Sequence, residues 1–231
     1  MEDAGMDVRR VLGAAAITGA VALGSVGAFW DREEGRERLT VSYEVAGPVD
    51  ELVVDGGTGG IDVRAGDTLR VVEKQDFRGD PPRTRHSLVD GTLRLAYDCS
   101  DCGVGYEVTV PAGTAVRLNS GTGGIRLRGL AGEVRASAGV GGVEASGLTS
   151  AKVRVTADTG GVELSFAASP VSVEARSEVG GVRVSVPGGE PYAVDAGTEV
   201  GGVEVTVPRQ AGAARSITAR AGTGGVAVTG G

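Results

Sequence analysis

The chain has 231 residues and a net charge of −7, and lysine occurs only at Lys74 and Lys152. An acidic chain without a basic patch or an aromatic platform argues against nucleic-acid binding. Forty-one glycines and only eight aromatic residues (one Trp, four Tyr, three Phe) argue against a core built around large side chains.

The first predicted element is an apolar segment over residues 11–30. It carries no charge, follows Arg9 and Arg10 and precedes Asp31. About 20 apolar residues suffice for a helix to cross a bilayer. Positively charged residues beside a membrane span favour the cytoplasmic side, so the two arginines place residues 1–10 in the cytoplasm. The sequence therefore predicts a single-pass membrane anchor.

A cleaved signal sequence is the alternative for this segment. Val26-Gly27-Ala28 offers the small residues of a cleavage site, and cleavage would give a secreted protein. In both cases the rest of the chain is extracytoplasmic. We predict a linker over residues 31–37 and one domain over residues 38–231.

A short phrase then recurs seven times: Gly-Gly, Val or Ile, any residue, and an apolar residue. The phrases begin at Gly59, Gly123, Gly141, Gly160, Gly180, Gly201 and Gly224, so from the second onward the steps are 18, 19, 20, 21 and 23 residues. A period near 20 residues is typical of stacked-repeat proteins. Such proteins present surfaces more often than they build catalytic clefts.

Each phrase is flanked by alternating aliphatic and polar residues, the pattern of strands with one buried face. Nine residues before the aliphatic anchor, for example, stand Val134, Val153, Val173 and Val194 in four successive units. Each unit is therefore a strand, a glycine corner and a second strand, and we predict regular rungs over residues 116–231. The fold class is all-β, a β-solenoid similar to a single-stranded β-helix. An antiparallel sandwich or meander, with hairpins at the glycine pairs, is the alternative.

An irregular insert over residues 64–115 separates the first phrase from the second. Strands are predicted at Thr68 to Glu73, Thr92 to Tyr97 and Tyr106 to Val110. Residues 76–85, which contain Pro81-Pro82, are predicted as a loop, and His86 beside them as an exposed loop residue. Because the first two phrases begin 64 residues apart, close to three repeat periods, degenerate rungs are expected to fill part of the gap.

The two cysteines, Cys99 and Cys102, lie in this insert. Outside the cytoplasm a disulfide is the default for such a pair. Free redox-active thiols and a metal site are the alternatives, but a metal site needs about four ligands and the chain has one histidine. We predict a disulfide, with no bound metal and no cofactor.

No catalytic set can be assembled from the sequence, and the remaining candidate site is a row of charges. One residue beyond successive anchors stand Arg126, Glu144, Glu163, Arg183 and Glu204, which we call the charged ladder. Stacked rungs would align them as a mixed-sign stripe on the outside of the coil. The stripe is either a solvated face or a binding surface for a glycan or a cation.

Several segments together resemble the bacterial adhesin family known as DUF4097. They are Leu52-Val53-Val54 leading to Gly59-Gly60-Ile61-Asp62-Val63, then Tyr106 to Gly113 with its Val-Pro-Ala-Gly ending, then serial Gly-Gly-Val rungs. The resemblance covers roughly residues 40 to 231 and implies a β-solenoid-like fold in an envelope or surface setting. It brings no catalytic residues.

The sequence thus predicts a non-enzymatic, adhesin-like binding module of the bacterial envelope. Expected partners are the membrane, through residues 11–30, a cell-wall polymer or envelope protein, and a second copy bound through the end of the solenoid, where we expect the uncapped rung ending at Gly230-Gly231. A glycan-active enzyme using Glu144 or Glu163 and an envelope-stress sensor are the alternatives.

Overall fold

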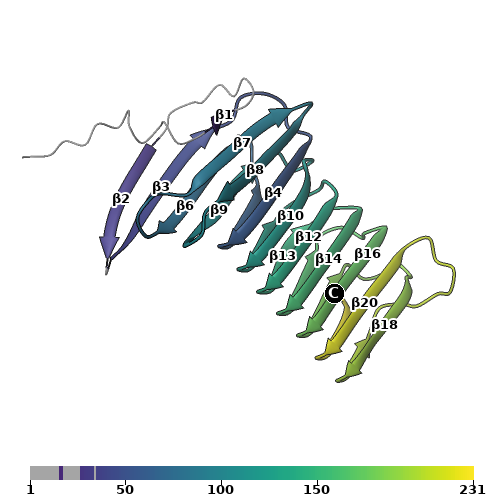
Figure 1. Cartoon of the computed structure of the whole chain (residues 1–231). Helices are drawn as coiled ribbons and strands as arrows, with labels where there is room; N and C mark the ends of the chain where they lie inside the picture. The colour runs from purple at the N-terminus through teal and green to yellow at the C-terminus, as the bar shows by residue number, and fades with distance from the viewer. Residues whose placement is uncertain (1–15, 18–26, 34) are drawn as a thin grey trace, which may run out of the picture.

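The computed structural model describes residues 16–17, 27–33 and 35–231, and within them the chain is all-β. Two large, mostly parallel sheets lie face to face along a stack that runs from β3 to β18 (Figure 1). The first sheet, in spatial order, contains β1 (Ala16–Ile17), β7 (Arg83–Val89), β8 (Thr92–Asp98), β4 (Glu51–Thr58), β10 (Ala115–Thr122), β12 (Val134–Val140), β14 (Lys152–Thr159), β16 (Ser172–Val179), β20 (Ser216–Thr223) and β18 (Ala193–Val200). The second contains β19 (Val203–Val205), β21 (Val226–Gly230), β17 (Val182–Val186), β15 (Val162–Phe166), β13 (Val143–Leu148), β11 (Ile125–Arg128), β5 (Ile61–Ala65), β9 (Cys102–Val110), β6 (Arg70–Phe77), β3 (Arg36–Glu44) and β2 (Gly27–Glu33).

Each repeat unit gives one strand to each sheet and turns between them at its glycine pair. The aliphatic columns of the sequence become rows of parallel partners: Val116 pairs with Val134, Val134 with Val153, and Val153 with Val173. The predicted alternation of buried and exposed residues is confirmed in these strands. In β15, for example, Val162, Leu164 and Phe166 are buried, whereas Glu163 and Ser165 are exposed. Neighbouring units are therefore parallel, and the antiparallel meander is wrong for the regular rungs.

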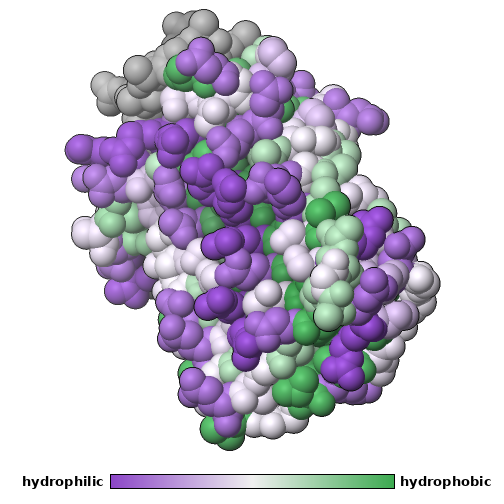
Figure 2. All heavy atoms as spheres, turned by 90° about the vertical axis from the view of Figure 1, so that its right-hand side faces the viewer, coloured by the Kyte–Doolittle hydropathy of each residue, from purple (hydrophilic) through white to green (hydrophobic). Residues whose placement is uncertain are grey.

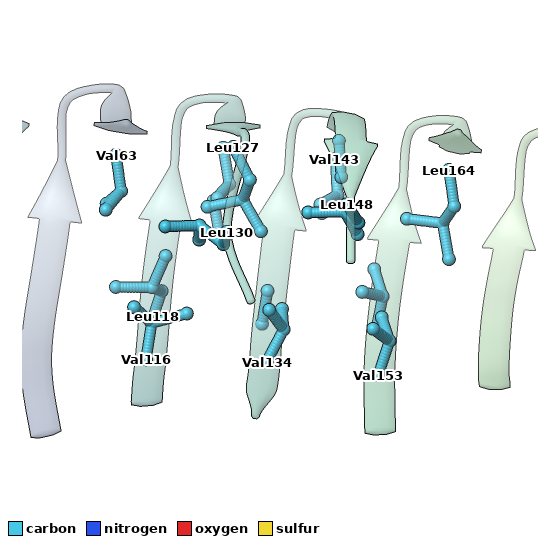
Figure 3. Close-up of a cluster of buried hydrophobic side chains, with 14 of the residues drawn as sticks. Val63, Val116, Leu118, Leu127, Leu130, Val134, Val143, Leu148, Val153 and Leu164 are labelled. Carbon is cyan, nitrogen blue, oxygen red and sulfur yellow. The ribbon is translucent and has the colours of Figure 1, made fainter. Parts of the chain in front are cut away.

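The core lies between the two sheets and consists of small aliphatic side chains. Val116, Val134 and Val153 point inward from one sheet, toward Leu127 and Leu164 of the other (Figure 3). Like side chains stack on one another at the strand spacing, about 4.8 Å. A core of this width is filled by Val, Leu and Ala, which is why the chain needs few aromatic residues.

The insert contains one complete extra rung, fewer than the roughly three periods between the first two phrases would allow. In this rung β8 pairs in parallel with β4, and β9 pairs in parallel with β5. Its corner has no glycine pair; instead Cys99 and Cys102 are joined by a disulfide there. The register of β5 with β9 places Val104 and Gly105 opposite Gly59 and Gly60, so the disulfide closes a short loop just before the position of the glycine pair.

The remaining strands of the insert are antiparallel. The strand β6 runs antiparallel to both β9 and β3, and β7 runs antiparallel to β8. The predicted loop over residues 76–85 is therefore too long, because β6 extends to Phe77 and β7 begins at Arg83. The prediction that His86 is an exposed loop residue is wrong: it lies in β7, with 7% of its surface exposed.

The predicted anchor over residues 11–30 lies largely outside the described residues. Its end is not helical, because β2 begins at Gly27 and pairs with β3, from Gly27 opposite Ser42 to Glu33 opposite Arg36. The same pairing includes most of the predicted linker at 31–37. Among the described residues no helix is long and apolar enough to cross a membrane.

The rungs do not stack in the order of the sequence at the far end. The rung β20–β21 lies between β16–β17 and β18–β19, so β18 and β19 are the edge strands. The prediction that the rung ending at Gly230-Gly231 forms the open end is therefore wrong. Residues 206–215 connect the edge strand β19 to β20. Val207 is buried in this connection, and Tyr192, which pairs with Arg209, is buried beside it.

Candidate functional site: a groove along the glycine corners

The first glycine of each pair is required by the backbone. Gly160 has φ +142°, and a Cβ on it would lie 2.4 Å from the carbonyl oxygen of Gly141 in the rung below. The other six first glycines have φ between +136° and +147° and the same kind of backbone approach. Only glycine adopts this conformation without strain and lets the corners stack so closely.

The peptide group between the two glycines points its carbonyl inward. Ser177 Oγ donates to the carbonyl oxygen of Gly160 at 2.8 Å, and Thr198 Oγ1 donates to that of Gly224 at 2.8 Å. Ser120 Oγ likewise donates to Gly123 at 3.0 Å. Because a trans peptide holds its N–H opposite its C=O, the N–H of the second glycine points outward. The described residues offer these second-glycine N–H groups no hydrogen-bond partner.

These outward groups form the floor of a groove of about 740 Å³ that crosses six rungs. The second glycines of the six rungs line it, and they are, in stack order, Gly124, Gly142, Gly161, Gly181, Gly225 and Gly202. We call it the glycine groove. Rungs repeat about every 4.8 Å, so the groove carries one free backbone donor at each interval.

The charged ladder forms one wall of this groove, and all five of its residues line it. Arg126 is the register partner of Glu144, Glu144 of Glu163, and Glu163 of Arg183. The swapped rung order then places Ala227 between Arg183 and Glu204. The sequence thus predicts the alignment of the first four residues, but not the neutral position before the fifth.

Two ion pairs lie along the wall. Arg126 Nε is 3.7 Å from Glu144 Oε2, and Arg183 Nη1 is 3.6 Å from Glu163 Oε2. All four side chains are more than half exposed, so each pair contributes at most about 1 kcal/mol to stability. The ladder is therefore available for ligand contacts without a large cost to the fold.

A second polar cluster, which the sequence analysis missed, is buried between the sheets beside the insert. Glu73 is 1% exposed; Tyr43 Oη donates to its Oε1 at 3.0 Å, and Gln75 Nε2 donates to its Oε2 at 3.2 Å. His86 Nε2 lies 2.5 Å from Glu73 Oε1. Burial, together with the Glu73 carboxylate, raises the pKa of Tyr43 far above its ordinary value, so Tyr43 remains a donor.

The cluster links the sheets rather than opening to solvent. Its residues come from β3 and β6 of one sheet and β7 of the other, and Glu73, Tyr43 and His86 are each less than a tenth exposed. The sequence of β7 does contain a pattern that predicts a buried His86. Successive side chains of a strand face opposite sides, so the exposed Arg83 and Arg85 imply that His86 faces inward.

The edge rung leaves part of the core uncovered. Val203 belongs to the anchor column, which is buried in the neighbouring rungs at Val182 and Val226, yet it is 49% exposed. In the view from the right-hand side of Figure 1, hydrophobic side chains reach the surface in the lower part, at the height of β18 and β20 (Figure 2). The outward residues Asp195, Glu199 and Glu204 are acidic, which opposes pairing of this edge with an identical edge.

The two glycines of one corner should differ sharply in amide hydrogen exchange. Gly123 N donates to Val140 O at 2.7 Å and Gly160 N to Val179 O at 2.8 Å, whereas Gly124 N and Gly161 N have no partner among the described residues. We expect the first glycine of each pair to exchange on the order of a hundredfold more slowly than the second. Exchange measured by NMR on the 123/124 and 160/161 pairs tests this, and equal rates within a pair would contradict the outward peptide geometry.

Comparisons with known proteins identify no family. No family model matches the chain, so the DUF4097 resemblance gains no support there, and no curated protein matches it. Among solved structures, a candidate cell adhesion protein from Clostridium sporogenes is 15% identical with a TM-score of 0.49, over 88% of this chain and 99% of that chain. A candidate adhesin from Bacteroides fragilis is 16% identical with a TM-score of 0.46, over 83% and 97%. Likeness at this level defines no function.

Proposed function

We propose that the protein is a non-enzymatic, adhesin-like binding module of the bacterial envelope, and that the glycine groove is its binding surface. The observation that carries the proposal is the groove itself, which crosses six parallel rungs and joins free backbone donors to the charged ladder. A rigid stack repeats one set of contacts along a line. Such a surface suits an extended polymer better than a compact ligand.

The ladder carboxylates favour binding over catalysis. Glu144 and Glu163 are 66% and 59% exposed, and each faces an arginine. Glycosidase carboxylates work as a pair on either side of the bond that is cut, whereas these two lie side by side along one wall. The envelope setting is supported by the disulfide between Cys99 and Cys102, a bond typical of compartments outside the cytoplasm.

Binding of the full chain to isolated envelope fractions tests the proposal. We expect the chain to sediment with either cell-wall sacculi or membranes, and we expect Glu144→Arg with Glu163→Arg to reduce the bound fraction several-fold. The matched control is Glu133→Arg with Glu174→Arg, which also reverses two carboxylates paired with arginines (Arg135, Arg154 and Arg176), but on the other sheet. Equal binding by the two double variants would show that the groove is not the surface, and no binding of the unmodified chain to either fraction would overturn the proposal.

Two further partners are proposed. The membrane is one of them, through the part of residues 11–30 that lies outside β1 and β2. A second copy is the other, bound through the edge strands β18 and β19. The acidic residues Asp195, Glu199 and Glu204 on that edge weaken association between identical edges.

A further inference from the structure

The fold does not explain the second glycine at most of the corners. Gly142 and Gly181 are the exceptions, because a Cβ there would lie 2.9 Å and 3.2 Å from the carbonyl oxygen of the next rung. No second glycine has a φ in the left-handed region. A Cβ would make only ordinary contacts at Gly161 and Gly225, 3.5 Å and 3.6 Å from the next carbonyl oxygen, and would meet nothing within 4 Å at Gly202. An alanine would therefore fit at these corners, yet all seven copies have glycine.

A glycine at this position has no side chain to cover its outward N–H, which therefore stays exposed to solvent. A side chain there would stand on the floor of the groove and shield the row of donors. Without it, six N–H groups face solvent in a line, one per rung, in a groove of about 740 Å³. From this we propose that the glycine groove binds a neutral, linear, hydroxyl-rich polymer, a polysaccharide, whose oxygen atoms accept hydrogen bonds from successive second-glycine N–H groups. The inference rests on the proposed function and names its ligand class.

The charges along the wall of the groove argue against a polyanionic ligand. The wall carries, in stack order, Arg126, Glu144, Glu163, Arg183, Ala227 and Glu204, which is three carboxylates against two guanidinium groups. A phosphate or carboxylate polymer would meet like charge along half of the wall. A hydroxyl group both donates and accepts, so it can bond to a backbone N–H and to a carboxylate in the same rung.

The interval between donors in the groove favours a polysaccharide over an extended polypeptide as the ligand. Donors in the groove recur about every 4.8 Å, the distance between strands. Carbonyl groups on one side of an extended polypeptide recur every second residue, roughly 6.7 Å apart. A peptide would therefore lose alignment with the row after one or two rungs, whereas sugar units of an extended glycan repeat at nearly the interval of the rungs.

The lining of the groove also predicts how tight this binding is. Its described lining residues include no aromatic side chain, so sugar rings have no stacking platform. Recognition then depends on hydrogen bonds repeated over several rungs. Because each rung adds one contact of the same kind, affinity should rise steeply with glycan length until six rungs are filled.

Titration of the full chain with cellobiose and cellohexaose, and with chitobiose and chitohexaose, tests the inference. For at least one series we expect the hexasaccharide to bind at least about tenfold more tightly than the disaccharide. In ¹H–¹⁵N NMR spectra the amides of Gly142, Gly161 and Gly181 should shift on binding, whereas the first-glycine amides of Gly141, Gly160 and Gly180 should shift much less. The glycine pairs thus provide their own controls.

The variant Gly161→Ala with Gly225→Ala should weaken hexasaccharide binding at least about tenfold while keeping the unfolding midpoint of the parent chain. Gly113→Ala, an exposed site with nothing within 4 Å of the added Cβ and outside the groove, is the matched control. Hexasaccharide binding that is unchanged in the double variant, absent from both series, or weaker than binding of polyphosphate or a Gly-Ser peptide would overturn the inference. A chain that binds envelope fractions through the groove yet binds neither hexasaccharide would leave the proposed function standing.

Discussion

Replacing Gly160 by alanine is expected to destabilise the stack by more than about 4 kcal/mol, enough to unfold the rungs around it. Gly160 has φ +142°, a region that only glycine occupies readily. The new Cβ would also lie 2.4 Å from the carbonyl oxygen of Gly141, which is backbone and is fixed by the adjoining rung. Urea unfolding followed by circular dichroism measures the loss of free energy.

The neighbouring residue provides the control for this prediction. Gly161→Ala places a Cβ 3.5 Å from the nearest atom and needs no unusual φ, so we expect a change within about 1 kcal/mol. The two variants have the same composition and lie in the same corner. If Gly160→Ala proves as stable as Gly161→Ala, the explanation of the glycine pair given above is wrong.

The second large effect is expected from His86→Ala. The substitution leaves the Glu73 carboxylate, which is 1% exposed, without the ring nitrogen that lies 2.5 Å away. Removing one partner of a buried carboxylate typically costs about 3–5 kcal/mol, because the carboxylate stays buried. Tyr43 and Gln75 still donate to Glu73 and should hold the cost near the lower limit. The unfolding free energy of the variant measures it.

Two further variants test whether this loss of stability comes from the Glu73 carboxylate, left buried without its histidine partner. Replacing the whole cluster by apolar residues, with Glu73→Met, His86→Leu and Tyr43→Phe, should recover most of the lost stability. Lys74 is next to Glu73 but faces outward, where it forms an exposed ion pair with Glu107. Lys74→Ala should therefore change stability by less than about 1 kcal/mol. A large effect of Lys74→Ala, or none of His86→Ala, would contradict the proposed role of the buried pair.

The regular part of the fold is predictable because its sequence constraints are local. Alternation fixes which residues of a strand face inward, and the constant spacing across Gly-Gly fixes how strands follow one another around the corner. The partnership of Val134 with Val153, and of Glu144 with Glu163, follows from these two facts alone. For this reason the sequence also predicts the first four positions of the charged ladder.

The order of the last two rungs could not be predicted, because their side chains fit the same position in the stack equally well. Val194 and Ile217 occupy the same column, as do Ala196 and Ala219, and both pairs are register partners in the structure. Either rung could follow β16–β17 on side-chain grounds, so no local pattern reveals which is at the edge. Similarly, Glu73 and His86 occupy inward positions that usually hold apolar residues, and their pairing joins segments whose contact the sequence does not disclose.

The interchanged positions of β18–β19 and β20–β21 have a consequence for how the protein forms. A coil whose turns lie in chain order can grow by adding each newly synthesised turn to the one before it. Here the turn made earlier is held only through the turn made later, since β18 pairs with β20 and not with β16. Residues 193–205 must therefore wait, or first dock where β20–β21 belongs and then be displaced, so completion of this end cannot be a purely vectorial process.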